Sequence, residues 1–181
     1  MYLCVNFCGL NHISKKDCYL LLLISDLLDS SHKAQVYSKI DLCHTYHLVC
    51  IANGDEWKTA FRTHYESFEW SVMSFSLTNA PIAFQWFMND IFSNLLDVCV
   101  VIYLDNILIY LNSMSKHHWY VKRVLTHFHK TGLYAKAKKC EFYSESVEYL
   151  EYILSSSGLT MSDNNVKIIQ DWPEPKKVKD I

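Results

Sequence analysis

Hydrophobic residues in this chain occur in two kinds of pattern, long stretches with helical spacing and short dense runs. The long stretches predict helices at residues 19–30, from about 78 to 96, 116–131 and 163–172. Pro81 suits the first turn of the second helix because proline needs no amide donor there. Gly132 suits the end of the third helix because glycine readily adopts the left-handed conformation.

The short runs are rich in β-branched and aromatic residues and predict strands. They cover residues 36–41, 47–51, 57–62, 68–73, 98–104, 107–111, 141–143 and 147–154. Asp105 and Asn106 alone separate two of these runs, and so short a connection predicts a hairpin. Because strands and helices alternate irregularly, we predict an α+β fold in which helices pack on one face of an antiparallel sheet.

The composition is that of a folded domain. Half of the 181 residues are hydrophobic and 20% are charged, which excludes an intrinsically disordered chain. A formal net charge of −2 excludes a protein that coats nucleic acid through overall positive charge. Glycine and proline are scarce, with 4 and 3 residues, although turns favour both.

Seven cysteines at irregular spacing predict free thiols in a reducing compartment rather than a disulfide framework. The N-terminus lacks the basic segment and cleavage site of a secretory signal, so we expect an intracellular location. No apolar run reaches the length of about 18 residues that a membrane helix needs, so we expect no membrane association.

Two aspartates stand at the ends of predicted strands. Asp41 ends the strand at 36–41, and Asp105 lies at the hairpin tip Tyr103-Leu104-Asp105-Asn106. If these strands are neighbours, the two carboxylates lie side by side and a divalent cation relieves their repulsion, for which Mg²⁺ is well suited. Aspartate is also a common turn and cap residue, so the spacing alone leaves a purely structural role open.

Two further groups of residues have possible binding chemistry. Seven Lys or Arg residues and no Asp or Glu occur between residues 116 and 139, which fits either a surface that tracks phosphates or a solvated helix face. A zinc module built on His44 and His47, or on Cys4 and Cys8, is a weaker alternative because the usual paired spacing of zinc ligands is absent.

A series of segments along nearly the whole chain resembles a known family in order and spacing. The segments are residues 5–11 (VNFCGLN), 38–42 (SKIDL), 46–47 (YH), 54–62 (GDEWKTAFR), 77–81 (LTNAP), 84–85 (FQ), 88–92 (MNDIF), 103–105 (YLD), 132–136 (GLYAK), 139–142 (KCEF) and 172–173 (WP). Together they resemble the reverse transcriptase domain of gypsy-type LTR retrotransposon polyproteins. The match is far more specific than a lone Tyr-x-Asp box.

The resemblance implies a polymerase palm plus part of the fingers. It divides the chain into a partial fingers segment at 1–35, a palm at 36–172 and the start of a truncated connection at 173–181. It implies an RNA-directed DNA polymerase that uses two Mg²⁺ ions for nucleotidyl transfer. The implied partners are an RNA or DNA template-primer, deoxynucleoside triphosphates and the rest of a Gag-Pol-like polyprotein.

The resemblance also assigns roles to six residues. Asp41 and Asp105 are the implied metal ligands, and Asn106 and Lys139 complete the catalytic group, with Lys139 near the position of the lysine that protonates the leaving pyrophosphate. Tyr46 corresponds to the aromatic residue that stacks under the incoming sugar and excludes a 2′-hydroxyl, and Phe75 to a residue of the nucleotide pocket. Read without the family, Tyr46 is equally a core tyrosine and Lys139 a solvated lysine.

The chain departs from the family at functional positions. Asn106 replaces the second aspartate of the metal box, and Glu151 replaces the glycine of the hairpin that contacts the primer. Most departures, such as Asp to Asn, Gly to Glu and Arg to Cys, each need one C-to-T or G-to-A transition, and this process also explains the scarcity of Gly and Pro. We therefore expect a degenerate copy with weak or lost activity. The alternative is a catalytically dead relic with at most weak nucleic-acid binding.

Overall fold

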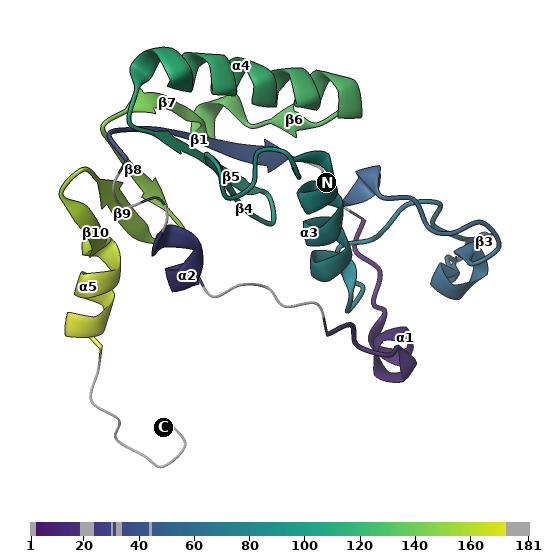
Figure 1. Ribbon diagram of the computed structural model, residues 1–181. Coiled ribbons are helices and arrows are strands. Elements are labelled where there is room, and N and C mark those ends of the chain that lie inside the picture. The colour runs from purple at the N-terminus through teal and green to yellow at the C-terminus, as the bar shows by residue number, and fades with distance from the viewer. Residues whose placement is uncertain (1–2, 19–23, 30, 32–33, 44, 173–181) are drawn as a thin grey trace.

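The computed structural model describes residues 3–18, 24–29, 31, 34–43 and 45–172 (Figure 1). Its centre is an antiparallel sheet in the order β4-β5-β1, and both β6 and β7 pair with the far side of β1. The strands are β4 (Val100–Tyr103), β5 (Asn106–Leu111), β1 (Val36–Cys43), β6 (Tyr134–Ala135) and β7 (Glu141–Ser144). The α+β class and the antiparallel sheet are therefore confirmed.

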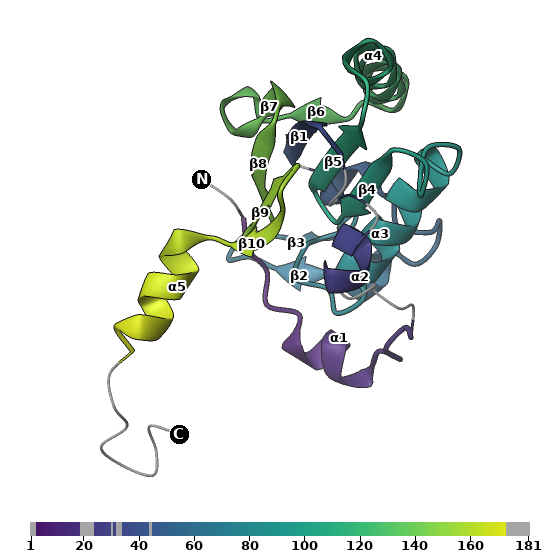
Figure 2. The ribbon, with the colours of Figure 1, turned by 60° about the vertical axis from the view of Figure 1, so that its left-hand side comes forward.

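Both faces of β4, β5 and β1 are largely buried, and β4 and β5 accordingly appear in the sequence as almost continuous apolar runs. On one face, Ile40, Ile102 and Ile107 pack against α3 (Ala80–Ile91) and α4 (Met114–Thr131). On the other face, alternate residues such as Val101 and Leu108 pack with α2 (Ile24–Asp29) and a second sheet. Figures 1 and 2 show α4 and this second sheet on opposite sides of the central one.

The second sheet has the order β10-β9-β8 and corrects the prediction of one strand over residues 147–154. Its strands are β8 (Ser146–Tyr149), β9 (Tyr152–Ser155) and β10 (Gly158–Met161). Leu150 and Glu151 form the turn between β8 and β9, with φ of +50° and +70°. Because this turn lacks the glycine or asparagine that marks such φ values, the sequence pattern missed it.

The helices agree better with their predictions than the short strands do. Gly132 ends α4 in the left-handed conformation at φ +71°, and Pro81 lies in the first turn of α3, both as expected. However, α3 ends at Ile91 rather than near Leu96, and α5 spans Asp163–Gln170. The helix predicted at 19–30 is described only as α2, and the predicted connection at 173–181 lies outside the described residues.

Most of the strands predicted between residues 47 and 73 are wrong. This region contains short 3-10 helices at Tyr46–Leu48 and Glu56–Thr59 and only two-residue strands, β2 (Phe61–Arg62) and β3 (Ser67–Phe68). Its aromatic side chains stack on one another instead, with the His47 and Trp70 rings 5.8 Å apart. Strand propensity largely measures how well side chains pack, and here the packing occurs in irregular backbone.

The helix α1 (Cys8–Ile13) was not predicted, and it contains no buried residue. A side-chain amide attaches it to the segment before α3. Asn11 Nδ2 donates to the Ser76 carbonyl at 2.9 Å, and Asn11 Oδ1 accepts from the Thr78 amide at 2.9 Å. This part of the fold therefore depends on hydrogen bonds, which hydrophobic periodicity does not detect.

Candidate functional site

The tip of the β4–β5 hairpin presents Asp105. The two turn residues are Leu104 and Asp105, because Tyr103 pairs with Asn106, so the predicted Asp-Asn connection is shifted by one residue. Leu104 has a φ of +54°, which is unfavourable for a residue with a side chain. The buried Gln85 of α3 secures the turn: its Oε1 accepts from the Leu104 amide at 2.7 Å, and its Nε2 donates to the Ile102 carbonyl at 3.1 Å.

The structure brings Asp41 and this hairpin tip together. Asp41 on β1 lies directly opposite Asn106 on β5, and the next amide, that of Leu42, donates to the Asp105 carbonyl at 2.8 Å. The two aspartates thus lie at the same end of neighbouring strands, as the sequence analysis expected. Asp41 is largely buried and has only 11% of its side chain exposed.

Two lysines balance the charge of Asp41. Lys136 Nζ lies 2.7 Å from Asp41 Oδ1, and Lys139 Nζ lies 3.4 Å from Asp41 Oδ2. Both lysines come from the segment that contains β6, which the Lys136 amide joins to the Asp41 carbonyl at 2.8 Å. The direct contact with Asp41 raises the pKa of Lys136, and the charge of Asp105 adds to this effect.

Asn106 contributes an amide at the position where the sequence resemblance leads us to expect a carboxylate. Its Nδ2 donates to Asp105 Oδ1 at 3.3 Å, so it satisfies part of the charge of the neighbouring aspartate. Its carbonyl accepts from the hydroxyl of Tyr149 on β8 at 3.0 Å. Burial raises the pKa of Tyr149, so this hydroxyl keeps its proton and remains a donor.

A cavity of about 310 Å³ opens beside the hairpin tip. It is lined by Leu42, Cys43, Thr45, Tyr46, His47, Phe75, Asp105 and Lys136. Tyr46 packs against Phe84 with ring centroids 5.1 Å apart, and burial followed by the charge of Asp105 raises its pKa. Phe75 is 45% exposed. Of the six predicted site residues, Tyr46, Phe75 and Asp105 share the cavity, whereas Lys139 reaches the site through Asp41.

The site offers oxygen atoms, which are the ligands that a hard divalent cation prefers, but only two carboxylates supply them. Asp41 and Asp105 supply carboxylates, and Mg²⁺ is commonly held by one or two carboxylates together with substrate phosphates. The described residues include no cluster of three or more His, Cys, Asp or Glu side chains suited to a metal ion, so nothing described supports the zinc alternative. One of its ligands, His44, lies outside the described residues.

Sequence reasoning gave no individual role to three residues that shape the site: Gln85, Lys136 and Tyr149. Gln85 carries a usable signal, because it is an amide that stands between the aromatic residues Phe84 and Trp86 of α3 and buried amides need partners. Lys136 and Tyr149 carry none, because their importance depends on β6 and β8 lying beside strands that are distant in the sequence.

The central sheet brings Asp41 of β1 next to Asp105 of the β4–β5 turn and has two helices packed behind it, an arrangement that fits the class of nucleic-acid polymerases. Residues 3–154 match the model of the family "Reverse transcriptase (RNA-dependent DNA polymerase)", and the chain belongs to this family. Over 177 residues it is 36% identical to the transposon Tf2-7 and Tf2-3 polyproteins of Schizosaccharomyces pombe, which identifies a reverse transcriptase domain of the gypsy-type LTR retrotransposon kind. The match covers 98% of the chain but only 13% of those polyproteins.

Solved structures support the same fold. A foamy viral protease-reverse transcriptase in complex with double-stranded DNA matches 97% of this chain and 31% of its own with a TM-score of 0.87. The same viral protein in complex with an RNA/DNA hybrid matches 97% of this chain and 24% of its own with a TM-score of 0.84. Sequence identity is 19% in both cases, so the likeness concerns the fold. Within the described residues, no helix has both the length and the apolar character to cross a bilayer.

Proposed function

We propose that this chain is a template-directed DNA polymerase domain whose nucleotidyl transfer is weakened by Asn106. The observation that carries the proposal is the convergence of Asp41 and Asp105 at one end of the central sheet, beside a cavity lined by Tyr46 and Phe75. One fold can serve many functions, so the proposal depends on the groups at the site. These groups suit phosphoryl transfer because they combine oxygen ligands for a hard metal ion with aromatic surfaces for a nucleotide.

The proposed roles follow from the chemistry of each group. Asp41 and Asp105 would hold the divalent ions that the family generally uses, and such ions would supply charge stabilisation for displacement at phosphorus. The primer 3′-hydroxyl oxygen forms a bond to the α-phosphorus of the nucleotide as the bond to pyrophosphate breaks, and the hydroxyl proton passes to water. Tyr46 supports the sugar, Phe75 contacts the nucleotide, and Lys139 gives a proton to the pyrophosphate.

Weakened catalysis follows from the charge balance at the carboxylates. Asp41 already has two ammonium partners, and the Asn106 amide occupies part of Asp105. A cation must therefore compete with Lys136 and Lys139, and it meets one carboxylate fewer than in the family. Metal stabilisation of the transition state is worth several kcal/mol, and each ~1.4 kcal/mol changes the rate about tenfold.

The proposed substrates are a primed RNA or DNA template and deoxynucleoside triphosphates, with Mg²⁺ as the metal. The similar viral protein was solved in complex with double-stranded DNA and with an RNA/DNA hybrid. Because the curated relatives are polyproteins of which this chain spans 13%, we place the domain within a longer Gag-Pol-like protein. Weak binding of primed template without catalysis is the second candidate, and the full pairing of Asp41 with lysines favours it.

The test is primer extension on a primed RNA template with Mg²⁺ or Mn²⁺, using the unmodified chain and Asn106→Asp. We expect extension to rise by at least tenfold in Asn106→Asp because the third carboxylate strengthens metal binding. Asp105→Asn in the Asn106→Asp background is the matched control. This double variant has as many carboxylates at the site as the unmodified chain, but the acid is at position 106 and not at 105. It should abolish extension.

Thermal unfolding provides a readout that does not depend on catalysis. Without metal, Asn106→Asp should be less stable than the unmodified chain, because a carboxylate replaces the amide that donates to Asp105. Mg²⁺ should then raise its unfolding temperature more than that of the unmodified chain. Equal Mg²⁺ effects and no extension by either protein would reject the polymerase proposal and favour binding without catalysis.

A further inference from the structure

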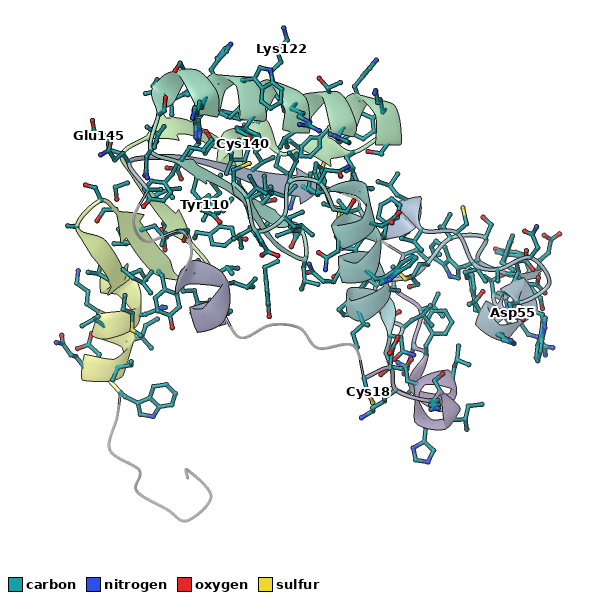
Figure 3. The ribbon with its side chains drawn as sticks, in the orientation of Figure 1. Cys18, Asp55, Tyr110, Lys122, Cys140 and Glu145 are labelled. Atoms are coloured by element: carbon teal, nitrogen blue, oxygen red, sulfur yellow. The ribbon has the colours of Figure 1, made fainter. Side chains whose placement is uncertain are left out.

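The basic stretch at residues 116–139 separates into two surfaces in the structure. Lys136 and Lys139, which follow α4, contact Asp41 and belong to the site described above. The basic residues of α4 itself lie on a different surface, because the helix packs on the sheet through His117, Val121, Val124 and Phe128. Figure 3 shows Lys122 on the side of α4 that faces away from the sheet.

The outward side of α4 carries a linear stripe of cationic and aromatic groups. Positions three and four residues apart share one helix face, and the stripe follows that spacing. It consists of Lys116, Trp119, Arg123, Thr126 and Lys130, with Lys122 beside it. From Lys116 to Lys130 the helix rises by about 21 Å at ~1.5 Å per residue. The helix has no Asp or Glu that could neutralise the stripe.

Trp119 is the aromatic centre of this stripe. Its side chain is 54% exposed, and the Arg123 guanidinium lies 5.2 Å from the centre of its ring. The Tyr120 ring meets it edge-on at 4.8 Å, which restricts how the indole can move. A fixed, exposed aromatic surface beside a planar cation is the arrangement on which an unpaired base stacks, while lysines on either side contact phosphates.

We propose that the outward face of α4, termed the α4 stripe, binds single-stranded nucleic acid separately from the polymerase site. The proposal goes beyond the proposed function, since it requires neither metal nor catalysis. Charge complementarity identifies the ligand as a polyanion, and Trp119 selects one with accessible bases. A lipid surface suits the helix less well, because Val121, Val124 and Phe128 are buried against the sheet. Of the exposed apolar residues Met114, Trp119 and Leu125, only Trp119 belongs to the stripe.

Fluorescence anisotropy tests the proposal on the folded chain. The probe is a labelled single-stranded oligonucleotide of about 20 nucleotides, longer than the usual binding sites of ~4–16 nucleotides. Trp119→Ala should weaken binding by about five- to a hundredfold through lost stacking. Lys122→Gln should weaken it less and reduce the slope of log K against log salt by about 0.7.

The chain offers matched controls for both changes. Trp86→Ala removes an equally exposed indole, 61% accessible, from α3, and Lys167→Gln removes an exposed lysine from α5. Neither control should change the affinity. Trp119→Phe keeps an aromatic ring and should recover part of the binding that Trp119→Ala loses. Circular dichroism melts should show that all variants fold, because each change is at an exposed position.

The possible results separate the α4 stripe from the polymerase site. Loss of single-strand binding in Trp119→Ala, with primed-template affinity unchanged, supports the proposal. If Lys136→Gln and Lys139→Gln abolish single-strand binding while Trp119→Ala leaves it intact, the strand binds at the polymerase site and the proposal is wrong. Undetectable binding at low salt, or binding to anionic vesicles that exceeds binding to the oligonucleotide, also overturns it.

Discussion

We predict that His117 makes the folding stability of this domain depend on pH, because its buried surroundings disfavour the protonated side chain. The side chain is fully buried between α4 and the central sheet, where Nε2 lies 2.7 Å from the Ser38 hydroxyl. The Tyr143 amide also donates to that hydroxyl oxygen at 3.1 Å, and the Tyr143 ring faces His117 edge-on. His117 Nδ1 has no hydrogen-bond partner among the described residues. A second proton would therefore create a buried charge without a counter-ion.

Burial lowers the pKa of His117 from 6.5 to about 4. Because the native pKa is below the unfolded one, the unfolded chain binds more protons between these values, and stability falls as the pH falls through this window. The full difference corresponds to about 3 kcal/mol at ~1.36 kcal/mol per pH unit. From pH 7 to pH 5 the loss is about 2 kcal/mol, which is a large part of the stability of a small domain.

Urea unfolding at pH 7 and pH 5 measures this loss. His117→Gln cannot take up the proton, so its decrease in unfolding free energy should be about 2 kcal/mol smaller than that of the unmodified chain. His129→Gln changes an exposed histidine of the same helix and should retain the full decrease. An NMR titration of the unmodified chain gives a second test, with a His117 midpoint near 4. A midpoint near 6.5 together with equal losses in both variants would refute the reasoning.

Two further predictions concern the hairpins. Glu151→Gly should stabilise the domain by about 1 kcal/mol, because Glu151 has a φ of +70° that glycine adopts without strain. The control Glu148→Gly, within β8, should destabilise the domain by a similar amount. Thermal unfolding measures both variants, and equal shifts in unfolding temperature would contradict the role of φ. Gln85→Ala should cost about 1–3 kcal/mol by leaving the Leu104 amide without its acceptor; unchanged urea unfolding would show that the turn does not depend on Gln85.

The parts of the fold that could be predicted are those that hydrophobic burial determines. The strands β4 and β5 were recognisable because both of their faces are buried, so their sequences are almost continuously apolar, whereas β1 keeps Ser38, Lys39 and Asp41 among its apolar residues. The sequence suggested that Asp41 and Asp105 would be close if their strands were neighbours, and the structure adds the register, in which Asp41 lies opposite Asn106. The β8–β9 turn was missed because Leu150 and Glu151 adopt positive φ without the residues that usually signal it.

The positions of the two acids could be read from the sequence pattern, whereas Lys139 entered only through the family resemblance and Lys136 had no individual role. Asp41 and Asp105 follow short apolar runs, and that position is visible in the sequence. Lys136 and Lys139 reach Asp41 only because β6 pairs with β1, and a two-residue strand has no pattern of its own. The aromatic residues around Trp70 gave the opposite error, since their strand-like composition serves ring stacking in irregular backbone.

The backbone and the side chain of Asn106 make different contacts. Its backbone pairs with β1 and accepts the Tyr149 hydroxyl, and neither interaction depends on the side chain being an amide or an acid. The side chain alone contacts Asp105. Exchange between Asn and Asp therefore keeps the backbone contacts of this position and alters the contact with Asp105 and the charge that a metal ion would meet. For this reason a chain can keep the reverse transcriptase fold along its described length while its ability to hold metal declines, and activity and folding must be measured separately.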